Sequence, residues 1–378
     1  MRIGFDASVI FSSAGGTRVY ATQLLSALLG LKPDWTYFLY SRTAEQAREL
    51  KRLWPAPNVE AAFVAGRPNA LRTQARLPSQ LRLDRIDVYH SLGYFLPLGW
   101  AGPKVVTIHD LNIYLNWRNW IRSRRLLRWA DMALQTPLSA RAADRIITDS
   151  EFSKDSICRL LHVAPQKVAA IPLAPDPFFD AEPSADEIDE ARTLAAGAPF
   201  ILYVGVLSPQ KNLGTLIKAF AASSLPAAGA RLLLAGSDSG HGSALRAEAV
   251  ASGVSGQVQF PGFVSRPLLR ALYHQALVAV LPSVGEGFGL PLVEAMASGA
   301  PVLAANRQSL PEVVGDAGCL FEPNDVSGLA GLLNHISTDE AFRADLVRRG
   351  RARRQRFSWR SAALATAAIY EEVALQHR

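Results

Sequence analysis

The sequence predicts an α/β protein with two doubly wound, parallel-sheet domains in tandem. Short β-branched apolar runs alternate with longer amphipathic stretches, which is the pattern of βαβ units around a sheet buried on both faces. The chain has 378 residues, and domains usually have roughly 100–200 residues, so two cores are expected. Hydrophobic residues make up 49% of the chain and charged residues 19%, which is enough apolar material for both cores.

The first series contains five predicted strands. They are Ile3–Asp6, Thr36–Tyr40, Val88–His90, Val105–His109 and Arg145–Thr148. Between them, Val19–Leu29 and Ala44–Leu53 have the apolar spacing of helices, and Gly30 is expected to end the first of these. This series predicts an N-terminal domain of residues 1–176.

A proline-rich stretch, Ile171–Pro183, is the predicted linker between the domains. An acidic helical pattern begins after it at Ala185, and a second series of strands follows. These strands are Phe200–Val204, Leu232–Ala235, Val258–Phe260, Val278–Leu281 and Val302–Ala304. The second domain is expected to comprise residues 177–358. A last helix, Trp359–Leu375, places residues 359–378 back towards the N-terminal domain.

The charge of the chain is distributed unevenly. Residues 1–176 contain 23 Lys and Arg against 14 Asp and Glu, whereas the remainder contains 17 against 19. The basic half is therefore expected to meet an anionic partner, either a phospholipid surface, a phosphate-bearing substrate or a nucleic acid. Signatures of the common nucleic-acid-binding modules are absent from the sequence, so no nucleic-acid partner is expected.

Apolar runs and cysteines indicate the compartment. The longest apolar runs are far shorter than the ~18–20 residues that span a bilayer. Asp6 interrupts the apolar N-terminal run, which is therefore expected to form a first strand rather than a signal peptide. Cys158 and Cys319 have neither disulfide-framework nor zinc-ligand spacing. A cytoplasmic protein without a metal site is expected.

The strongest motif is VLPSVGEGFGLPLVEAMASGAP, residues 280–301. An apolar strand is followed by a glycine-rich loop, and a helix runs from about Pro291 until Gly299 ends it. Glycines let backbone amides approach an anion, and the positive end of a helix dipole favours negative charge, so this segment predicts a phosphate site. Glu286 and Glu294 flank the loop. Because carboxylates repel phosphate, we expect them to accept hydrogen bonds from hydroxyls on either side of it.

The spacing Glu286-x7-Glu294 resembles the E-x7-E signature of glycosyltransferase family 4, and the resemblance extends over nearly the whole chain. It implies the GT-B fold, in which two Rossmann-like domains face each other across a cleft. The implied activity is retaining transfer of a hexose from a nucleotide-diphosphate sugar to an acceptor hydroxyl. The resemblance assigns catalytic roles to His109 and Glu286. It assigns donor binding to Gly15, Gly16, Lys211, Val264, Gly287, Phe288, Gly289, Leu290 and Glu294.

Several of these assignments rest on particular segments. In YVGVLSPQKNL, residues 203–213, Lys211 resembles the family's cation for the diphosphate. The sequence departs from the family at Val206 and Gln210, where many relatives have a second arginine, so Lys211 carries more of this role. Glu286 would hold the sugar and Glu294 the ribose.

The first domain supplies the remaining implied contacts. The turn SSAGGTRVY, residues 12–20, lacks the G-x-G-x-x-G dinucleotide fingerprint, which argues against a nicotinamide cofactor. It resembles the family's G-G-x-x-x-Y loop, where the backbone of Gly15 or Gly16 approaches the donor phosphate. His109 is expected at the carboxyl end of a buried strand, near the donor sugar. Backbone near Val264 would contact the base, although core packing explains that residue equally well.

The segment Trp117–Trp129 contains five arginines and three tryptophans. Such a helix suits a lipid headgroup boundary or the diphosphate of a lipid-linked acceptor; a solvated, charge-rich helix is the alternative. The expected location is therefore the cytoplasm, with peripheral contact at the inner membrane face.

Two other functions remain open: a GT-B nucleotide-sugar epimerase, and a non-catalytic GT-B module in a glycan assembly complex. The stretches HSLGYFLP and TIHDL look most like mannosyltransferases of bacterial surface-polysaccharide and lipopolysaccharide assembly. GDP-mannose is therefore the expected donor, and a glycan or lipid-linked oligosaccharide the expected acceptor. Because no D-x-D occurs near the glycine loop, no metal or other cofactor is expected.

Overall fold

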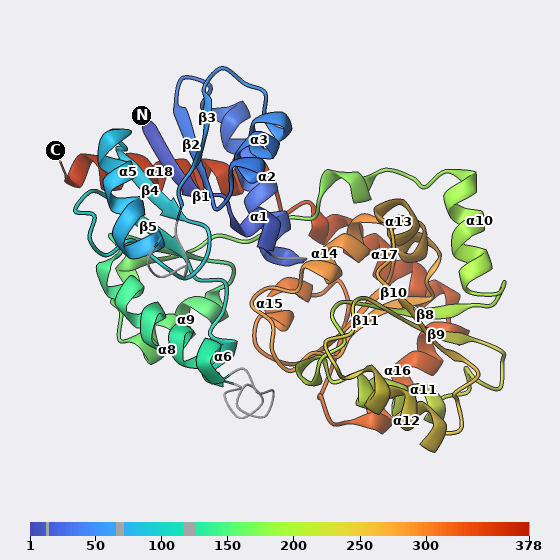
Figure 1. Ribbon diagram of the computed structural model, residues 1–378. Coiled ribbons are helices and arrows are strands. Elements are labelled where there is room, and N and C mark those ends of the chain that lie inside the picture. Colours follow the sequence, from blue (N-terminus) through green and yellow to red (C-terminus); the bar gives the residue numbers. More distant parts are fainter. Residues whose placement is uncertain (13–14, 66–71, 116–125, 378) are drawn as a thin grey trace. The chain divides into compact units, whose positions relative to one another are not determined.

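The computed structural model describes residues 1–12, 15–65, 72–115 and 126–377. The chain divides into two compact units, Met1–Leu173 with Ser358–Arg378, and Ala174–Phe357. The boundary lies slightly before the predicted one at residue 176, and the C-terminal segment is part of the first unit. Both chain ends accordingly belong to the first unit (Figure 1).

The described part of the first unit contains a parallel 7-stranded sheet in the order β3-β2-β1-β4-β5-β6-β7. Its strands are β1 (Arg2–Asp6), β2 (Thr36–Ser41), β3 (Val59–Phe63), β4 (Val88–Ser91), β5 (Lys104–Thr107), β6 (Arg145–Thr148) and β7 (Val168–Ala170). Its helices are α1 (Val9–Ser12), α2 (Gly16–Leu31), α3 (Ala44–Leu53), η1 (Arg72–Arg76), α5 (Leu77–Leu83), α6 (Asn112–Leu115), α8 (Leu126–Ala142), α9 (Glu151–Leu161), η2 (Pro165–Lys167) and α18 (Trp359–Gln376).

The second unit contains a parallel 6-stranded sheet in the order β10-β9-β8-β11-β12-β13. Its strands are β8 (Phe200–Val204), β9 (Arg231–Ala235), β10 (Val258–Gly262), β11 (Val278–Leu281), β12 (Val302–Ala305) and β13 (Cys319–Phe321). Its helices are η3 (Pro177–Asp180), α10 (Ala185–Leu194), η4 (Pro209–Lys211), α11 (Leu213–Ala222), α12 (Gly242–Ala251), α13 (Arg266–Gln275), α14 (Leu290–Ala297), α15 (Leu310–Val314), α16 (Val326–Thr338) and α17 (Glu340–Arg354).

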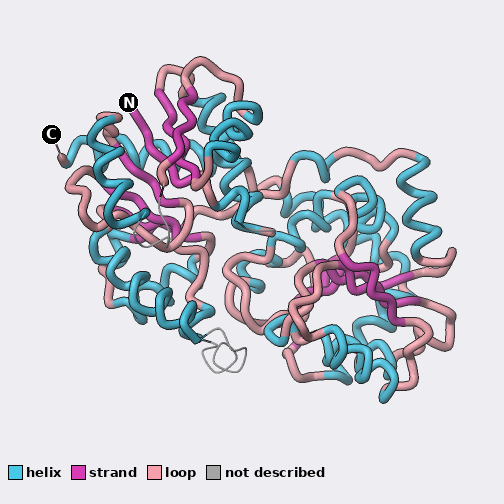
Figure 2. The backbone as a smooth tube through the Cα atoms, viewed as in Figure 1, coloured by secondary structure: helices cyan, strands magenta, loops and turns pink. Residues whose placement is uncertain are grey.

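Each sheet has the strand order of a doubly wound fold, which confirms the predicted fold class. Helices surround the strands of both sheets (Figure 2). The strand order reverses between β1 and β4 in the first unit and between β8 and β11 in the second. Crevices at such switch points, beyond the carboxyl ends of the strands, are where doubly wound proteins bind ligands. Each unit thus has one place where a site is expected.

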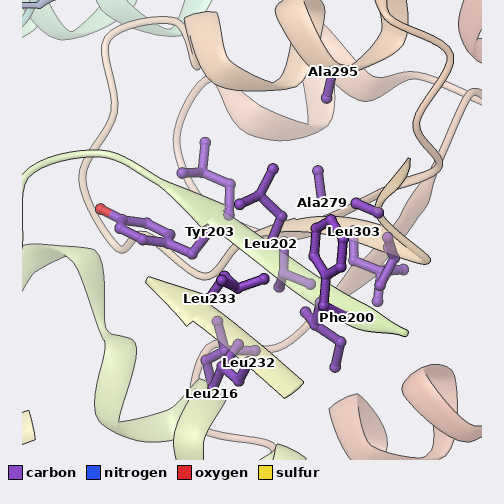
Figure 3. Packing of buried hydrophobic residues seen from close by; sticks show 14 of the residues in the cluster. Phe200, Leu202, Tyr203, Leu216, Leu232, Leu233, Ala279, Ala295 and Leu303 are labelled. Carbon is purple, nitrogen blue, oxygen red and sulfur yellow. The ribbon is translucent and has the colours of Figure 1, made fainter. Parts of the chain in front are cut away.

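The core of the second unit lies on both faces of its sheet. In Figure 3, side chains of β8 and β9 lie between Leu216 of α11 on one side and Ala295 of α14 on the other. Both residues are fully buried. This two-sided burial explains why the strands are nearly continuous apolar runs and why they could be predicted from the sequence.

The predicted strands all exist, but the short edge strands β3, β7 and β13 were not predicted. β7 and β13 have 3 residues each, and β3 contains a glutamate, so none of them forms an apolar run that stands out. β5 ends at Thr107, and the prediction that His109 lies within the strand was wrong. Ile108 still donates a backbone hydrogen bond to Ile147, so His109 is held just beyond the strand end.

The prediction that Gly30 ends the helix Val19–Leu29 was also wrong, because this helix, α2, continues to Leu31. Glycine inside a helix costs about 1 kcal/mol relative to alanine. The apolar face of α2 outweighs that cost, since it includes the fully buried residues Leu24, Leu25 and Leu28 and packs against α18 (Figure 1).

The C-terminal helix α18 is tied into the first unit by buried polar groups. The Tyr370 hydroxyl lies 2.5 Å from Nδ1 of His90, and Nε2 of His90 lies 2.8 Å from Oγ1 of Thr107. Thr107 also shares a 2.7 Å hydrogen bond with the Tyr20 hydroxyl. Burial lowers the pKa of His90 to about 3, so its ring is neutral and takes one proton donor and one acceptor role in this network.

No helix in the described ranges is long and apolar enough to cross a membrane. Most of the segment Trp117–Trp129, for which membrane contact was predicted, lies outside the described residues.

We expect the buried hydrogen bond between Tyr370 and His90 to contribute to the free energy of unfolding. Tyr370→Phe leaves a buried imidazole nitrogen without its partner, which should lower the free energy of unfolding by about 1–3 kcal/mol. The matched control is Glu371→Gln on the same helix, which removes only the exposed pair with Lys32 and should cost less than about 0.5 kcal/mol. Urea unfolding followed by circular dichroism measures both. Equal effects of the two substitutions would contradict a stabilising role for the buried network.

Candidate functional site

The site in the second unit is built from two loops at its switch point, one following β8 and one following β11. The first loop ends in the turn η4, which carries Lys211, and the second carries Glu286. The Lys211 Nζ lies 2.5 Å from Oε1 of Glu286, and the side chains are 16% and 14% exposed. The two residues predicted to bind the donor diphosphate and sugar are thus paired with each other in the free protein.

Several hydrogen bonds fix the Glu286 loop. The Val284 amide donates to the Gln210 carbonyl at 2.9 Å, which joins this loop to the one after β8. The Glu286 amide donates to Oε1 of Gln308 at 2.7 Å, and the Ser309 hydroxyl donates to the Glu286 carbonyl at 2.9 Å. The backbone beneath the glutamate is therefore set by residues following β12, which sequence reasoning did not include.

The predicted phosphate-binding loop ends at Gly289, the N-cap of α14. Gly289 has a φ of 107°, and a Cβ there would lie 2.8 Å from Cδ2 of Leu310. Only glycine fits this conformation and this space, and it offers no side-chain oxygen to the first amides of the helix. Those amides and the helix dipole favour an anion at this point.

Of the loop side chains, Phe288 and Leu290 point into the protein. Phe288 is 4% exposed, and its ring packs edge-on against Phe357 with centroids 5.6 Å apart; Leu290 is 7% exposed. Their predicted contribution to donor binding therefore falls on the backbone, while the side chains anchor the loop to the core.

Glu294 lies on α14 and is only 8% exposed. The Tyr273 hydroxyl lies 3.4 Å from its Oε2. Burial raises the pKa of Glu294 to about 8, the hydrogen bond from Tyr273 opposes this shift, and the nearby carboxylate of Asp176 adds to it. At neutral pH Glu294 is therefore mostly protonated, whereas the sequence led us to expect a carboxylate.

Val264 follows β10 and is half-buried against the core of the second unit. The residue before it, Phe263, is 81% exposed. The predicted contact of the Val264 backbone with the base stays a prediction.

In the first unit, the Gly15–Gly16 turn opens α2 directly after β1 and α1. Both glycines are exposed. Gly15 is the N-cap, with a φ of 134°, and its carbonyl accepts hydrogen bonds from the amides of Arg18 and Val19. As with α14, a helix begins at a glycine next to a switch point, which is a suitable anion site. The role of these glycines towards the donor also stays a prediction.

His109 lies beyond β5 and is 7% exposed. Its Nδ1 is 2.8 Å from Oδ2 of Asp149, which lies beyond β6. The Tyr20 ring packs edge-on against the imidazole with centroids 4.9 Å apart. The tyrosine of the G-G-x-x-x-Y turn therefore has a defined place, which is beside the histidine predicted to act at the sugar.

Sequence reasoning missed Asp149 and Tyr273. The position of Asp149 could have been predicted from the pairing of β5 with β6, in which Thr107 lies opposite Ile147. The residues two positions further along each strand are His109 and Asp149, and they therefore meet at the same sheet edge. The contact of Tyr273 with Glu294 could not be predicted from the sequence, because it depends on how α13 packs against α14.

Among the described residues, no group of three or more His, Cys, Asp and Glu side chains is arranged to hold a metal ion.

Two doubly wound units in tandem, one with a glycine-capped helix whose start is flanked by the E-x7-E glutamates, define a GT-B glycosyltransferase. The chain belongs to the glycosyltransferases: residues 184–353 match the family model "Glycosyl transferases group 1" and residues 14–177 match "Glycosyltransferase Family 4". The family predicted from the sequence is thereby confirmed.

Similar proteins include two curated mannosyltransferases. The chain is 30% identical to O-antigen chain mannosyltransferase B of Escherichia coli over 286 residues, which cover 75% of this chain and 74% of the relative. It is 31% identical to MMP alpha-(1->4)-mannosyltransferase of Mycolicibacterium hassiacum over 280 residues, 71% of this chain and 65% of that protein. Sucrose-phosphate synthase of Thermosynechococcus elongatus, at 22% identity, shares the fold with a TM-score of 0.75 over 99% of both chains.

The buried Glu294 predicts a pH-dependent stability. Its pKa of about 8 in the folded protein lies above the ordinary value of about 4.3, so the folded state holds the proton more tightly and stability falls as pH rises between these values. Glu294→Gln cannot ionise, and it should raise the melting temperature by roughly 2–6 °C at pH 8 while leaving it nearly unchanged at pH 4.

The control is Glu322→Gln, which removes an exposed carboxylate paired with Arg307 and should show no such difference between the two pH values. Differential scanning fluorimetry gives all four comparisons. If Glu294→Gln were equally destabilising at pH 4 and pH 8, Glu294 would not be a buried, protonated carboxyl group.

Proposed function

We propose that the chain is a retaining mannosyltransferase that uses GDP-mannose as donor and a hydroxyl of a lipid-linked or growing surface polysaccharide as acceptor. The mannose specificity is supported by the two relatives that are named mannosyltransferases, one for an O-antigen chain and one forming an alpha-(1->4) linkage. The alternative function, a nucleotide-sugar epimerase, is not supported by these two relatives, because both are named mannosyltransferases.

The observation that carries the proposal is the Lys211–Glu286 pair beside the glycine-capped start of α14. An ammonium group and a row of backbone amides suit a diphosphate, which has two anionic phosphates in line. A carboxylate next to them suits the hydroxyls of the sugar on that diphosphate. Lys211 and Glu286 form an ion pair, and a donor would replace this contact by one with each residue separately.

In the proposed reaction, the site promotes sugar transfer by stabilising the departing diphosphate. The bond between C1 of the sugar and the diphosphate oxygen breaks, and the acceptor oxygen forms a new bond to C1 on the same face. The acceptor proton passes to the departing diphosphate oxygen, so no protein nucleophile takes part. Lys211 and the amides of 287–290 would stabilise the charge that develops on the leaving group, while Glu286 and His109 would hold the sugar.

We propose that the basic first unit binds the acceptor. Helix α8, which begins within the arginine-rich segment Trp117–Trp129, exposes two leucines, Leu134 by 67% and Leu138 by 39%. Apolar side chains next to a basic segment suit a peripheral contact with a lipid surface, which supports the predicted location at the membrane face.

We further propose that transfer needs no metal or other cofactor, because a lysine and helix amides supply the positive charge for the diphosphate. Transfer in the presence of EDTA should proceed at the same rate as without it.

The experiment that tests the function has two parts. GDP-mannose, UDP-glucose and UDP-galactose are first compared for their ability to raise the melting temperature, because a ligand of the folded state must stabilise it. GDP-mannose is then incubated with the chain with and without a polyprenyl-diphosphate glycan. We expect GDP release to depend on the acceptor and an α-linked product to form. Conversion of the sugar without any acceptor would indicate an epimerase, and neither conversion nor release from any donor would contradict transferase activity.

Substitutions at the ion pair separate binding from turnover. Lys211→Ala should weaken GDP binding about 10- to 100-fold, because a charge-assisted hydrogen bond to phosphate is worth roughly 1.5–3 kcal/mol. Glu294→Ala should also weaken GDP binding. Glu286→Ala should reduce kcat at least about 100-fold and change GDP affinity less than about threefold.

Calorimetry measures GDP affinity, and acceptor-dependent GDP release measures kcat. The control is Lys218→Ala on α11, which breaks another Lys–Glu pair, with Glu248, away from the switch-point loops and should change neither quantity. Full turnover in Glu286→Ala would remove this residue from the mechanism.

A further inference from the structure

The turn between β12 and α15 supports the loop that carries Glu286. The Gln308 side chain accepts a hydrogen bond from the Glu286 amide through Oε1 at 2.7 Å. The Ser309 hydroxyl donates to the Glu286 carbonyl at 2.9 Å, and the Phe288 carbonyl also lies within its reach at 3.1 Å. Two consecutive residues of the turn therefore hold the backbone of the loop, one at an amide and the other at two carbonyls.

The backbone of Gln308 has an unfavourable conformation. Its φ is 50°, in the left-handed region, which glycine adopts readily and a glutamine seldom does. Such a conformation persists only where the surrounding structure imposes it. The next residues of the turn do so, because Leu310 is fully buried and its amide donates to the Arg307 carbonyl at 3.1 Å. The backbone thus gives no reason for a glutamine here, whereas the side-chain contact with Glu286 does.

The Glu286 side chain has to change partner when a donor binds. It contacts the Lys211 ammonium group at 2.5 Å, and in the proposed function it then accepts from a sugar hydroxyl. Its side chain can make this exchange accurately only if its backbone stays in place. A shift of about 1 Å at a positioning group can reduce turnover about 100-fold, so the support of the Glu286 backbone matters for the reaction.

The two supports act at different points of the loop. A trans peptide unit is planar, and its C=O and N–H point in opposite directions. By holding the Phe288 carbonyl, Ser309 therefore also sets the direction of the Gly289 N–H at the start of α14. The hydrogen bond of Gln308 is made three residues earlier, and the Phe288 ring is anchored separately against Phe357. Loss of the Gln308 contact should disturb Glu286 and leave the start of α14 in place.

We propose that Gln308 is a positioning residue that fixes the backbone of Glu286, so that the carboxylate can leave Lys211 and reach the sugar without a movement of the loop. This rests on the proposed function for the identity of the ligand. Ser309 supports both the Glu286 end of the loop and the start of α14. Because Gln308 keeps an unfavourable backbone conformation and supplies a useful side chain, stability and turnover should respond differently when it is replaced.

The first test needs neither donor nor acceptor. Hydrogen exchange of the Glu286 amide is followed by NMR in the wild type, in Gln308→Met and in Gln308→Gly. Both substitutions remove the acceptor, and both should speed exchange of this amide about 10- to 100-fold. The control is Ala196→Gly, because Ala196 is an exposed residue of the second unit with a similar φ of 52°. It should leave exchange at Glu286 unchanged.

The second test compares the melting temperature, kcat with GDP-mannose and GDP affinity. Glycine relieves the left-handed conformation and methionine does not, so Gln308→Gly should melt roughly 1–4 °C above Gln308→Met. In both variants kcat should nevertheless fall about 10- to 100-fold, with GDP affinity changed less than about threefold. Ala196→Gly should change neither kcat nor GDP affinity. Ser309→Ala should reduce kcat and also weaken GDP binding about 3- to 10-fold, because it releases both ends of the loop.

The outcomes separate the two proposals. Wild-type exchange at Glu286 in both Gln308 variants, or wild-type kcat in Gln308→Gly, overturns the positioning role, since turnover would then follow stability alone. If Gln308→Met does not fold, Gln308→Gly decides on exchange and kcat. Faster exchange at Glu286 in Gln308→Gly, together with no turnover of any sugar nucleotide by the wild type, would overturn the proposed function and leave the support of the loop by Gln308 standing.

Discussion

The ion pair between Lys211 and Glu286 is the contact on which the site of the second unit depends. It exists because a doubly wound parallel sheet brings the carboxyl ends of β8 and β11 together, although some 75 residues separate the two side chains in sequence. The same geometry brings His109 and Asp149 together after β5 and β6 in the first unit. In both units the functional side chains lie in the loops, and the sheets fix where those loops meet.

The buried side chains beneath the loops explain how such polar groups are tolerated. Burial keeps Glu294 protonated against the opposing effect of the Tyr273 hydrogen bond, and burial keeps His90 neutral between Tyr370 and Thr107. These groups avoid a buried charge by adjusting their protonation. Lys211 is instead paired with Glu286, and His109 with Asp149.

Much of this could be predicted from the sequence, because parallel strands buried on both faces are short, nearly continuous apolar runs and because the E-x7-E spacing is specific. Glu286, Lys211 and His109 were identified in this way. Contacts that depend on helix packing, such as Tyr273 with Glu294, have no local pattern and could not be predicted. The protonation of Glu294 was missed for a related reason, since burial is a property of the fold. Asp149 could have been found from the register of neighbouring strand ends.

In the proposed mechanism the second unit binds the nucleotide diphosphate at the start of α14, and a crystal structure of the chain with GDP would locate this diphosphate. We expect the terminal phosphate within hydrogen-bond distance of Lys211 Nζ and the amides of 287–290, the ribose hydroxyls at Glu294, and Lys211 no longer in contact with Glu286. A nucleotide bound elsewhere, with the Lys211–Glu286 pair intact, would contradict the account.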